Sequence, residues 1–340
     1  MLLIGGDLAI GTTHYNLTLL EPDSGHLIKT FLNIPFQPNS CLIWNDIAFI
    51  SSFSQIISPP NYGYLYSYDL ISGGLSTTHN IRITQNPIAS LNVLENKLYI
   101  SQYNVRDYDT VSINGIKTLT RGITIIDLAT ASVFPNPYSN FQIIHSIKMY
   151  HGKLFRFGIP DSYFDIFRSN FIALDTLNNK ILNPGFPGVD NNFNMNMQVS
   201  GNLGMLNYNG GIDFEKHFGA GILNLNTLKF TGFNPKFGSG GAYTLVVADS
   251  TLFLGGTFKD VDQRIVRNFV AYNYITNTRD TTHDLRFNNV VYAMELLNDS
   301  IILIGGLFDS VNGTSQNYFV AYNFKSKSLS GNYSARFNWA

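Results

Sequence analysis

Short apolar segments alternate with polar, glycine-rich segments along the whole chain. Phe269 to Tyr274 is one such apolar segment, and clusters of Asn, Asp, Ser and Gly separate it from the next. Aromatic residues reach 14%, with 19 Tyr and 26 Phe. This pattern predicts many short β-strands joined by tight turns. We therefore predict an all-β protein.

The chain repeats itself most clearly between Thr251 and Ala340. The segment Leu252–Phe258 returns fifty residues later as Ile302–Phe308, and the segment Asn268–Asn273 returns as Tyr318–Asn323. A period near fifty residues is typical of a propeller blade or a solenoid unit. The internal repeat therefore decides the predicted architecture.

The same apolar anchor recurs over residues 1–340. The seven anchors are Leu2, Ala48, Leu98, Leu154, Leu203, Leu252 and Ile302. Each copy begins on a strand B at the anchor, continues through strands C and D, and supplies strand A of the next copy. Four antiparallel strands repeated radially predict a single seven-bladed β-propeller domain of four-stranded blades spanning residues 1–340.

Two kinds of turn support this division of the copies. Strand C ends each time in a residue that can cap the following turn: Glu21, Asp69, Asp127, Asp175, Asn224, Asn273 or Asn323. Strand A ends in a pair suited to a tight hairpin: Asn45-Asp46, Glu95-Asn96, His151-Gly152, Ser200-Gly201, Ala248-Asp249 or Asn298-Asp299. Side chains of this kind form C–D turns and A–B hairpins.

Glycine doublets mark the ends of three strands B, at Gly5-Gly6, Gly255-Gly256 and Gly305-Gly306. Together with strand C and the Phe-Asn-Pro ends of strand D, they resemble the delta-60 repeat, a kelch-like β-propeller unit of bacterial secreted and surface proteins. In the middle copies, Ser51-Ser52, Ser101-Gln102 and Asn207-Tyr208 replace the glycines. The resemblance implies a propeller and an extracellular or cell-surface setting, and it carries over no catalytic residue.

We expect Gly255 and Gly305 to occupy equivalent positions at the end of strand B. A larger side chain there would collide with the neighbouring blade or force a disfavoured backbone conformation.

One blade is expected to lack its inner strand. The chain opens on strand B and ends on strand D, so seven B, C and D strands face only six A strands. Either this inner strand is absent, or preceding residues of a longer protein supply it. The second alternative is favoured, because an unpaired inner edge leaves backbone hydrogen bonds unmade.

The net charge and the cysteine content exclude several classes of binding partner and of covalent cross-link. The net charge is -1 and 13% of residues are charged, which disfavours binding to nucleic acid or anionic lipid. Cys41 is the only cysteine, so no internal disulfide forms, and its apolar neighbours place it in the core. We expect no signal peptide within this chain and no membrane insertion.

No cofactor is expected. Closely spaced oxygen ligands, such as calcium sites have, occur at Asp107-Tyr108-Asp109, Asp190-Asn191-Asn192 and Asp260-Val261-Asp262. None of these segments has a complete calcium-loop pattern. We therefore favour surface turns over calcium sites for all three segments.

Candidate binding residues lie in the B–C and D–A connections, which emerge on one face of a propeller. These connections are longest in copies three to five. The residues chosen for stacking or hydrogen bonding are Arg106, Tyr108, Tyr163, Phe164, Phe193 and His217. The alternative is that these are ordinary solvated loops held down by their aromatic side chains.

Two functions compete. The favoured one is a non-catalytic binding or scaffold module that presents its loop face to a protein or glycan, in a secreted, cell-surface or virion-associated protein. The alternative is a polysaccharide-acting hydrolase or lyase, with Asp161, Asp165, Asp213 and Glu215 as its carboxylates. The sequence leaves the question of an enzyme open.

Overall fold

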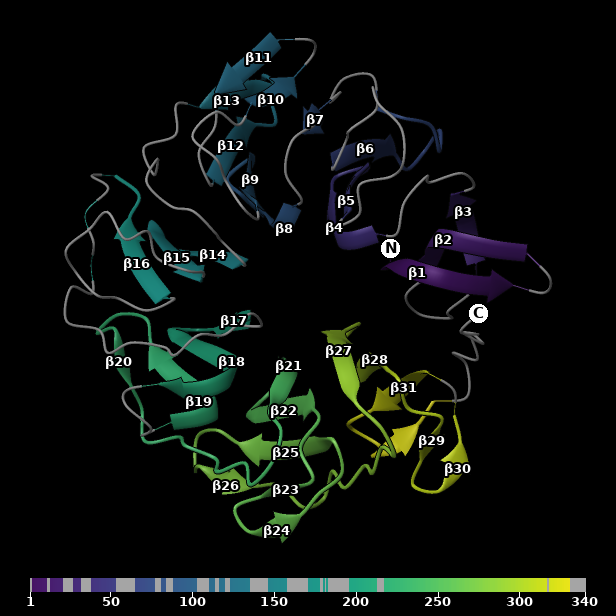
Figure 1. Ribbon diagram of the computed structural model, residues 1–340, viewed down its shortest axis with the longest axis vertical. Coiled ribbons are helices and arrows are strands. Elements are labelled where there is room, and N and C mark those ends of the chain that lie inside the picture. Colours follow the sequence, from purple (N-terminus) through teal and green to yellow (C-terminus); the bar gives the residue numbers. More distant parts are fainter. Residues whose placement is uncertain are drawn as a thin grey trace.

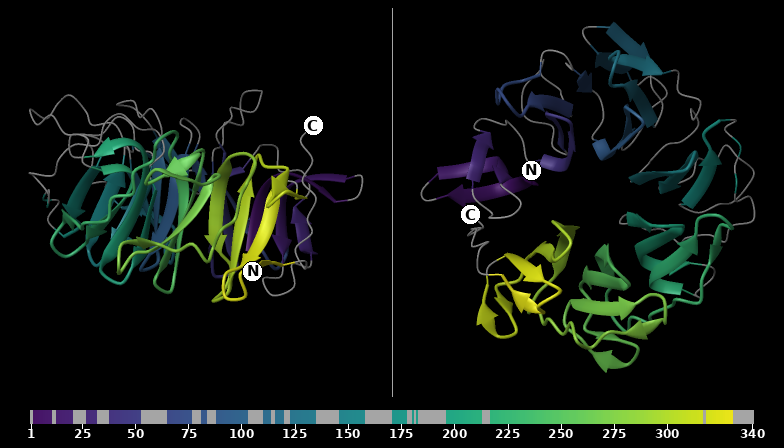
Figure 2. Two further views of the ribbon diagram at one scale, coloured as in Figure 1. Left: turned by 90° about the horizontal axis from the view of Figure 1, so that it is seen from below. Right: turned by 180° about the vertical axis from the view of Figure 1, so that it is seen from behind.

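The fold is described from a computed structural model (Figures 1 and 2). The structure describes residues 2–10, 13–20, 27–31, 38–52, 65–76, 81–83, 88–102, 110–113, 116–119, 123–134, 146–157, 171–177, 180, 182, 196–212, 217–316 and 318–330. Within these ranges the backbone forms strands and turns, and no helix occurs. The all-β prediction is confirmed.

The strands follow one another at short intervals. The first sixteen are β1 (Leu2–Ile10), β2 (Thr13–Leu20), β3 (Leu27–Phe31), β4 (Pro38–Trp44), β5 (Ile47–Ser52), β6 (Leu65–Asp69), β7 (Ile81–Ile83), β8 (Ile88–Leu94), β9 (Lys97–Gln102), β10 (Thr110–Ile113), β11 (Ile116–Leu119), β12 (Ile123–Asp127), β13 (Ser132–Phe134), β14 (Ser146–Tyr150), β15 (Lys153–Phe157) and β16 (Phe171–Asp175). The others are β17 (Asn196–Ser200), β18 (Leu203–Ile212), β19 (His217–Asn224), β20 (Lys229–Phe230), β21 (Ala242–Ala248), β22 (Thr251–Gly256), β23 (Asp260–Val261), β24 (Arg264–Ile265), β25 (Phe269–Asn273), β26 (Thr278–Arg279), β27 (Val291–Leu296), β28 (Ile301–Gly306), β29 (Ser310–Val311), β30 (Thr314–Ser315), β31 (Phe319–Asn323) and β32 (Ser328–Leu329).

Six antiparallel sheets form the blades of a β-propeller. In chain order they are β4-β5-β6, β8-β9-β12-β13, β14-β15-β16, β17-β18-β19-β20, β21-β22-β25-β26 and β27-β28-β31-β32. Figure 1 shows them side by side around one centre, each with its first strand innermost. We number them blades two to seven after the sequence copies. The propeller prediction is confirmed.

A further three-stranded sheet, β1-β2-β3, stands between blades seven and two in the ring (Figures 1 and 2). Its strands correspond to B, C and D of the first copy, and β1 pairs with β2 along Leu2–Ile10. The described residues contain no strand on the other edge of β1. That this sheet is a further blade, which would make seven, stays a prediction.

Packing between blades explains why strands B are apolar on both faces. In β22 every residue from Leu252 to Gly256 is buried, because neighbouring blades cover both sides of the sheet. One core cluster joins Val246 and Phe253 of blade six to Ile302 and Tyr322 of blade seven. Most of the stabilising apolar burial therefore lies between consecutive blades rather than within one.

Polar side chains of the inner strands bind the backbone of the next inner strand. Thr244 Oγ1 accepts a hydrogen bond from the Met294 N–H at 3.0 Å, and Gln198 Oε1 accepts one from the Val247 N–H at 3.1 Å. Asn92 Nδ2 donates to the Ile147 carbonyl at 2.7 Å. Inner strands have no sheet partner on the side of the ring centre, so these bonds satisfy part of that edge.

The predicted C–D turns are confirmed in six copies. The oxygen Oδ1 of the capping residue accepts backbone N–H groups of the following residues at Asp69, Asp127, Asp175, Asn224, Asn273 and Asn323. Glu21 lies outside the described residues. The short side chain thus forms each turn locally, without help from other blades.

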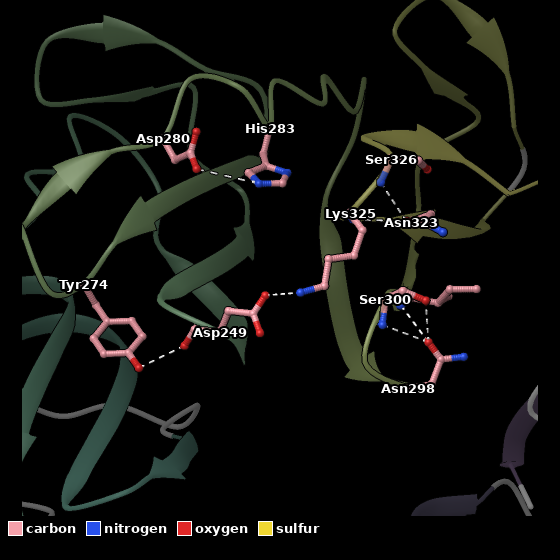
Figure 3. Close-up of polar contacts among 10 residues, drawn as sticks. Asp249, Tyr274, Asp280, His283, Asn298, Ser300, Asn323, Lys325 and Ser326 are labelled. Atoms are coloured by element: carbon pink, nitrogen blue, oxygen red, sulfur yellow. Dashed lines mark hydrogen bonds and ion pairs between the residues drawn. The ribbon is translucent and has the colours of Figure 1, made fainter.

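Most A–B hairpins also have the predicted conformation. Positive φ angles occur at Asn45 (51°), Glu95 (49°), His151 (42°) and Asp249 (52°). The last hairpin differs, because Asn298 Oδ1 accepts hydrogen bonds from the Ser300 and Ile301 N–H groups, each at 3.0 Å (Figure 3).

Three B–C connections form hairpins of their own. In blades six and seven these are β23–β24 and β29–β30, and bridges from Phe237 to Val261 and from Phe287 to Val311 tie each hairpin to the preceding blade. In blade three the hairpin β10–β11 pairs with β7 of the preceding copy. The long B–C connection of copy three, predicted as a loop, therefore contains paired strands.

The predicted collision is confirmed at Gly255 and does not occur with any described residue at Gly305. The two glycines do pair equivalently, with Thr244 and Ala293 of the inner strands. A Cβ on Gly255 would lie 2.5 Å from Cγ1 of Val291 in the next blade. Among the described residues, the nearest atom to a Cβ on Gly305 is the Tyr318 carbonyl oxygen, at 3.8 Å.

Candidate functional site

Most of the predicted binding residues lie outside the described residues, namely Arg106, Tyr108, Tyr163, Phe164 and Phe193. The same holds for the four carboxylates of the enzyme alternative, Asp161, Asp165, Asp213 and Glu215. The binding site in these connections and the enzyme alternative therefore both stay predictions.

His217 is the one predicted binding residue within the described ranges. It begins β19 and pairs with Ile212 of β18. The sequence places it in the B–C connection of copy five, and the structure shows that β18 and β19 extend into this connection past a register shift between Asn207 and Gly211. Whether His217 binds a ligand stays a prediction.

Two tyrosines gather on the face from which the D–A and B–C connections emerge, called here the loop face. The rings of Tyr243 and Tyr292 are stacked, with centroids 5.9 Å apart and planes 8° from parallel. Tyr292 is 52% exposed and Tyr243 is half-buried. We call these two side chains the tyrosine pair. Exposed, parallel rings of this kind offer a flat apolar surface edged by hydroxyl groups.

A β-bulge positions each member of the tyrosine pair. Ala242 pairs with Gly256 and Thr244 with Gly255, so Tyr243 is the extra residue of the inner strand. Tyr292 is the extra residue of β27 in the same way, between Val291 and Ala293. Bulges re-aim side chains and are frequent beside functional sites. The pair therefore stands on two rigid inner strands rather than on loops.

Two opposite charges on the inner strands β14 and β27 act on each other electrostatically. Burial lowers the pKa of Lys148 on β14, and the nearby negative charge of Glu295 on β27 partly offsets this. The pKa of Glu295 is raised by its enclosure, although solvent reaches its side chain, and Lys148 partly offsets that shift. The strands that carry them, β14 and β27, are the innermost strands of blades four and seven (Figure 1).

In the acidic segment Asp260-Val261-Asp262, the carboxylate of Asp262 accepts hydrogen bonds from other parts of the fold. Asp262 Oδ1 accepts the Lys236 N–H at 2.9 Å, and its Oδ2 accepts the Tyr272 hydroxyl at 2.5 Å. Burial and this hydrogen bond both raise the pKa of Tyr272. In the described part of the chain, no group of three or more His, Cys, Asp or Glu side chains could hold a metal ion. The other two acidic segments lie outside it.

In the next repeat, a buried histidine takes the place of Asp262 as the hydrogen-bond partner of the equivalent tyrosine. His283 stands where Phe233 stands fifty residues earlier, and its Nδ1 lies 2.8 Å from the Tyr322 hydroxyl. Its Nε2 lies 3.7 Å from Asp280 Oδ2 (Figure 3). Burial lowers the pKa of His283, which therefore stays neutral at pH 7. Both Tyr272 and Tyr322 thus keep a hydrogen-bond partner, supplied from different positions of the repeat.

We expect the stability of the protein to fall between pH 7.5 and 5.5 because of His283. Its pKa is lower in the folded than in the unfolded chain, so acidification favours the unfolded state, which takes up the proton. The variant His283→Phe, which copies Phe233, should show a melting temperature less sensitive to pH in this window. Thermal unfolding at several pH values compares the slopes, and equal slopes in the two proteins would contradict this role.

Cys41, predicted in the core, is half-buried at the edge of an apolar cluster. Cys41 lies in β4 and packs beside Ala48 and Ile50 of β5. Burial raises the pKa of its thiol to about 12, so the thiolate form is scarce at neutral pH.

Comparison with solved structures supports the propeller fold. The computationally designed Ika8 protein matches with a TM-score of 0.53 and 9% identity, over 91% of this chain and 77% of its own. The extracellular domain named BT4673 from B. thetaiotaomicron matches with a TM-score of 0.52 and 13% identity, over 85% of this chain and 32% of its own. A chain of the mitotic checkpoint complex matches with a TM-score of 0.53 and 11% identity, over 87% and 78%. At these identities the likeness concerns the fold alone.

No protein-family model matches the chain, and no curated protein matches it. Within the described residues, no helix has the length and hydropathy of a membrane span.

Sequence reasoning missed the tyrosine pair, although a signal was present. Tyr243 and Tyr292 occupy the same place in adjacent repeats, because each is the second residue of its strand A. Repeated aromatic residues at the start of strand A are therefore a signal of this surface, besides long connections. The bulges that expose both rings follow from pairing with β22 and β28, which the sequence pattern does not specify.

Proposed function

We propose that this chain is a non-catalytic binding or scaffold module whose loop face engages a protein or a glycan. The observation that carries the proposal is the tyrosine pair, exposed on the loop face and held by bulges of two rigid inner strands. Flat aromatic surfaces bind sugar rings or partner side chains at low entropic cost, because few side-chain torsions become ordered. The small net charge of -1 agrees with a partner that is not a polyanion.

We further propose that the β1-β2-β3 sheet is blade one and completes a ring of seven blades, with β1, β2 and β3 as its strands B, C and D. In support, β1 and β2 pair as strands B and C do elsewhere, and the sheet takes its place in the ring (Figure 1). The resemblance of the glycine doublets to the delta-60 repeat supports an extracellular or cell-surface setting. The long connections of copies three to five remain a second part of the proposed binding face.

A binding screen tests the proposed function. The probes are an array of defined glycans and an array of synthetic peptides, applied to the wild-type protein. The double variant Tyr243→Ala/Tyr292→Ala should lose about tenfold or more in affinity for any probe bound at the loop face, because the stacking surface is removed. The variant Tyr243→Phe/Tyr292→Phe should retain most of it.

A third variant separates the two parts of the face. Tyr108→Ala/Tyr163→Ala/Phe164→Ala should weaken binding if the connections of copies three to five contribute. Binding that survives both sets of changes would refute the loop face as the site. Cleavage of an arrayed glycan by the wild-type protein would instead favour the enzyme alternative.

A further inference from the structure

The tyrosine pair occupies a position of the fold that other blades fill with different residues. In β4, β8, β21 and β27 the inner strand has one extra residue opposite strand B, at the same point of the register. These four extra residues are Asn39, Ala89, Tyr243 and Tyr292. Because the same bulge forms with Asn or Ala, the backbone does not require an aromatic ring there. The two tyrosines therefore need an explanation other than the fold.

Close approach of the backbone fixes the start of both inner strands. A Cβ on Gly256 would lie 2.0 Å from the Gly241 carbonyl oxygen, and one on Gly306 would lie 2.1 Å from the Val290 carbonyl oxygen. Each of these carbonyl groups also accepts a hydrogen bond, at 3.0 Å, from the N–H of the residue that follows the glycine. The tyrosine pair is thus preorganised, and little conformational entropy is lost when a ligand binds.

The exposed apolar surface at this place is small. Among the described residues of blade seven, Tyr292 is the only exposed large apolar side chain. The ring of Tyr243 lies parallel to it. Stable protein–protein interfaces bury about 800 Å² on each partner and contain an apolar core of several residues. The tyrosine pair therefore matches the face of one small ring better than it matches a protein interface.

The segments that carry the two tyrosines are uncharged. Residues 237–248 and 287–294 contain no Asp, Glu, Lys, Arg or His. The next charged residue along β27 is Glu295, which three residues of strand place about 10 Å from Tyr292. A charged group bound over the rings would lose water and find no partner of opposite charge in these two segments. The tyrosine pair thus favours an uncharged ligand.

Uncharged hydrogen-bonding groups accompany the rings. Ser239 and Asn289 stand at equivalent positions of two D–A connections, and both are exposed. Asn289 Oδ1 accepts the Val290 N–H at 2.8 Å, and within the described part of the chain its Nδ2 group has no partner. The hydroxyl groups of Ser239 and of the two tyrosines can each donate or accept. A ligand that is rich in hydroxyl groups can use all of these groups.

We propose that the tyrosine pair binds a neutral oligosaccharide through the apolar face of one of its pyranose rings. The C–H groups on this face stack on an aromatic ring, while the sugar hydroxyl groups at the ring edge exchange hydrogen bonds with uncharged side chains. The inference rests on the proposed function of the loop face, because it takes the same site and names the class of its ligand.

Isothermal titration calorimetry with defined hexasaccharides tests this inference. The neutral probes are cellohexaose, laminarihexaose and mannohexaose, and the charged probe is hexagalacturonic acid. We expect at least one neutral probe to bind the complete chain at least about tenfold more tightly than the charged probe. Its affinity should change by less than about twofold between about 50 mM and about 500 mM salt, because ions do not screen contacts of a neutral ligand.

Three variants locate the binding. Tyr243→Ala/Tyr292→Ala should lose about tenfold or more in affinity for the neutral probe, and Tyr243→Phe/Tyr292→Phe should lose no more than about threefold. The double alanine variant should stay folded, as its melting curve will show, because Ala89 occupies the equivalent bulge of blade three. Tyr274→Ala is the matched control, since this tyrosine donates its hydroxyl to the Asp249 carbonyl at the opposite end of blade six, and it should bind the probe unchanged (Figure 3).

Four results would overturn the inference. Neutral hexasaccharide binding that survives the double alanine change would place the sugar elsewhere. Equal or tighter binding of hexagalacturonic acid would show that the site selects charge. Binding of synthetic peptides alone, lost in the double alanine variant, would overturn the inference and leave the proposed binding function intact. Finally, if no glycan or peptide depends on the two tyrosines, the inference and the proposed role of the tyrosine pair both fail.

Discussion

Phe253→Ala is expected to lower the free energy of unfolding by about 3–5 kcal/mol. Phe253 is fully buried between blades six and seven. Its ring centroid lies 5.1 Å from that of His283 and 5.9 Å from those of Phe269 and Phe324. Truncation removes apolar burial and leaves a cavity that strands held by two sheets cannot close. Urea unfolding followed by fluorescence measures the loss.

The repeat itself provides the control for this variant. Leu303 stands at the equivalent position of blade seven, so Phe253→Leu introduces a side chain that the same backbone position already accepts. Its cost should be about 1–1.5 kcal/mol, since most of the volume remains filled. A loss below about 1 kcal/mol for Phe253→Ala would mean that the interface between blades six and seven is looser than these contacts indicate.

Gly255→Val should destabilise the protein by about 1–3 kcal/mol, whereas Gly305→Val should change its stability by less than about 0.5 kcal/mol. Beside Gly255, a new Cβ would lie 2.5 Å from Val291 Cγ1 and 3.0 Å from Thr244 Cγ2, so the interface between blades must shift. Beside Gly305 the nearest atom of the described residues is the Tyr318 carbonyl oxygen, at 3.8 Å. The same unfolding measurement compares both variants.

The smaller change Gly255→Ala is the control for this pair, because it adds only the Cβ atom. Its loss should fall between zero and that of Gly255→Val. Equal losses for valine at Gly255 and Gly305 would contradict the difference between these two positions.

Local turn chemistry was predictable from the sequence because it depends on near neighbours alone. Asp69 and Asn273 each accept backbone N–H groups two and three residues ahead, which requires only a short polar side chain after strand C. Strand order was predictable for the same reason, since antiparallel neighbours joined by short turns pair in sequence. The hairpin β10–β11 was missed because its outer partner is β7 of the preceding copy.

The candidate site was predictable only in part. The sequence indicates which face carries the long connections, but it does not show that Tyr243 and Tyr292 stack, because their contact joins two blades. Nor does it distinguish the two equivalent glycines, since Gly255 and Gly305 follow nearly identical apolar segments. Their difference comes from what lies beside each blade.

By itself, the sequence of this protein determined the strands, their turns and the radial repeat, because the spacing of apolar residues and turn formers sets these features within about fifty residues. Only the tertiary structure decided which surfaces of equivalent repeats are covered. Val246 is buried and Glu295 is exposed because burial depends on the adjoining blade and not on the position of a residue within its own repeat.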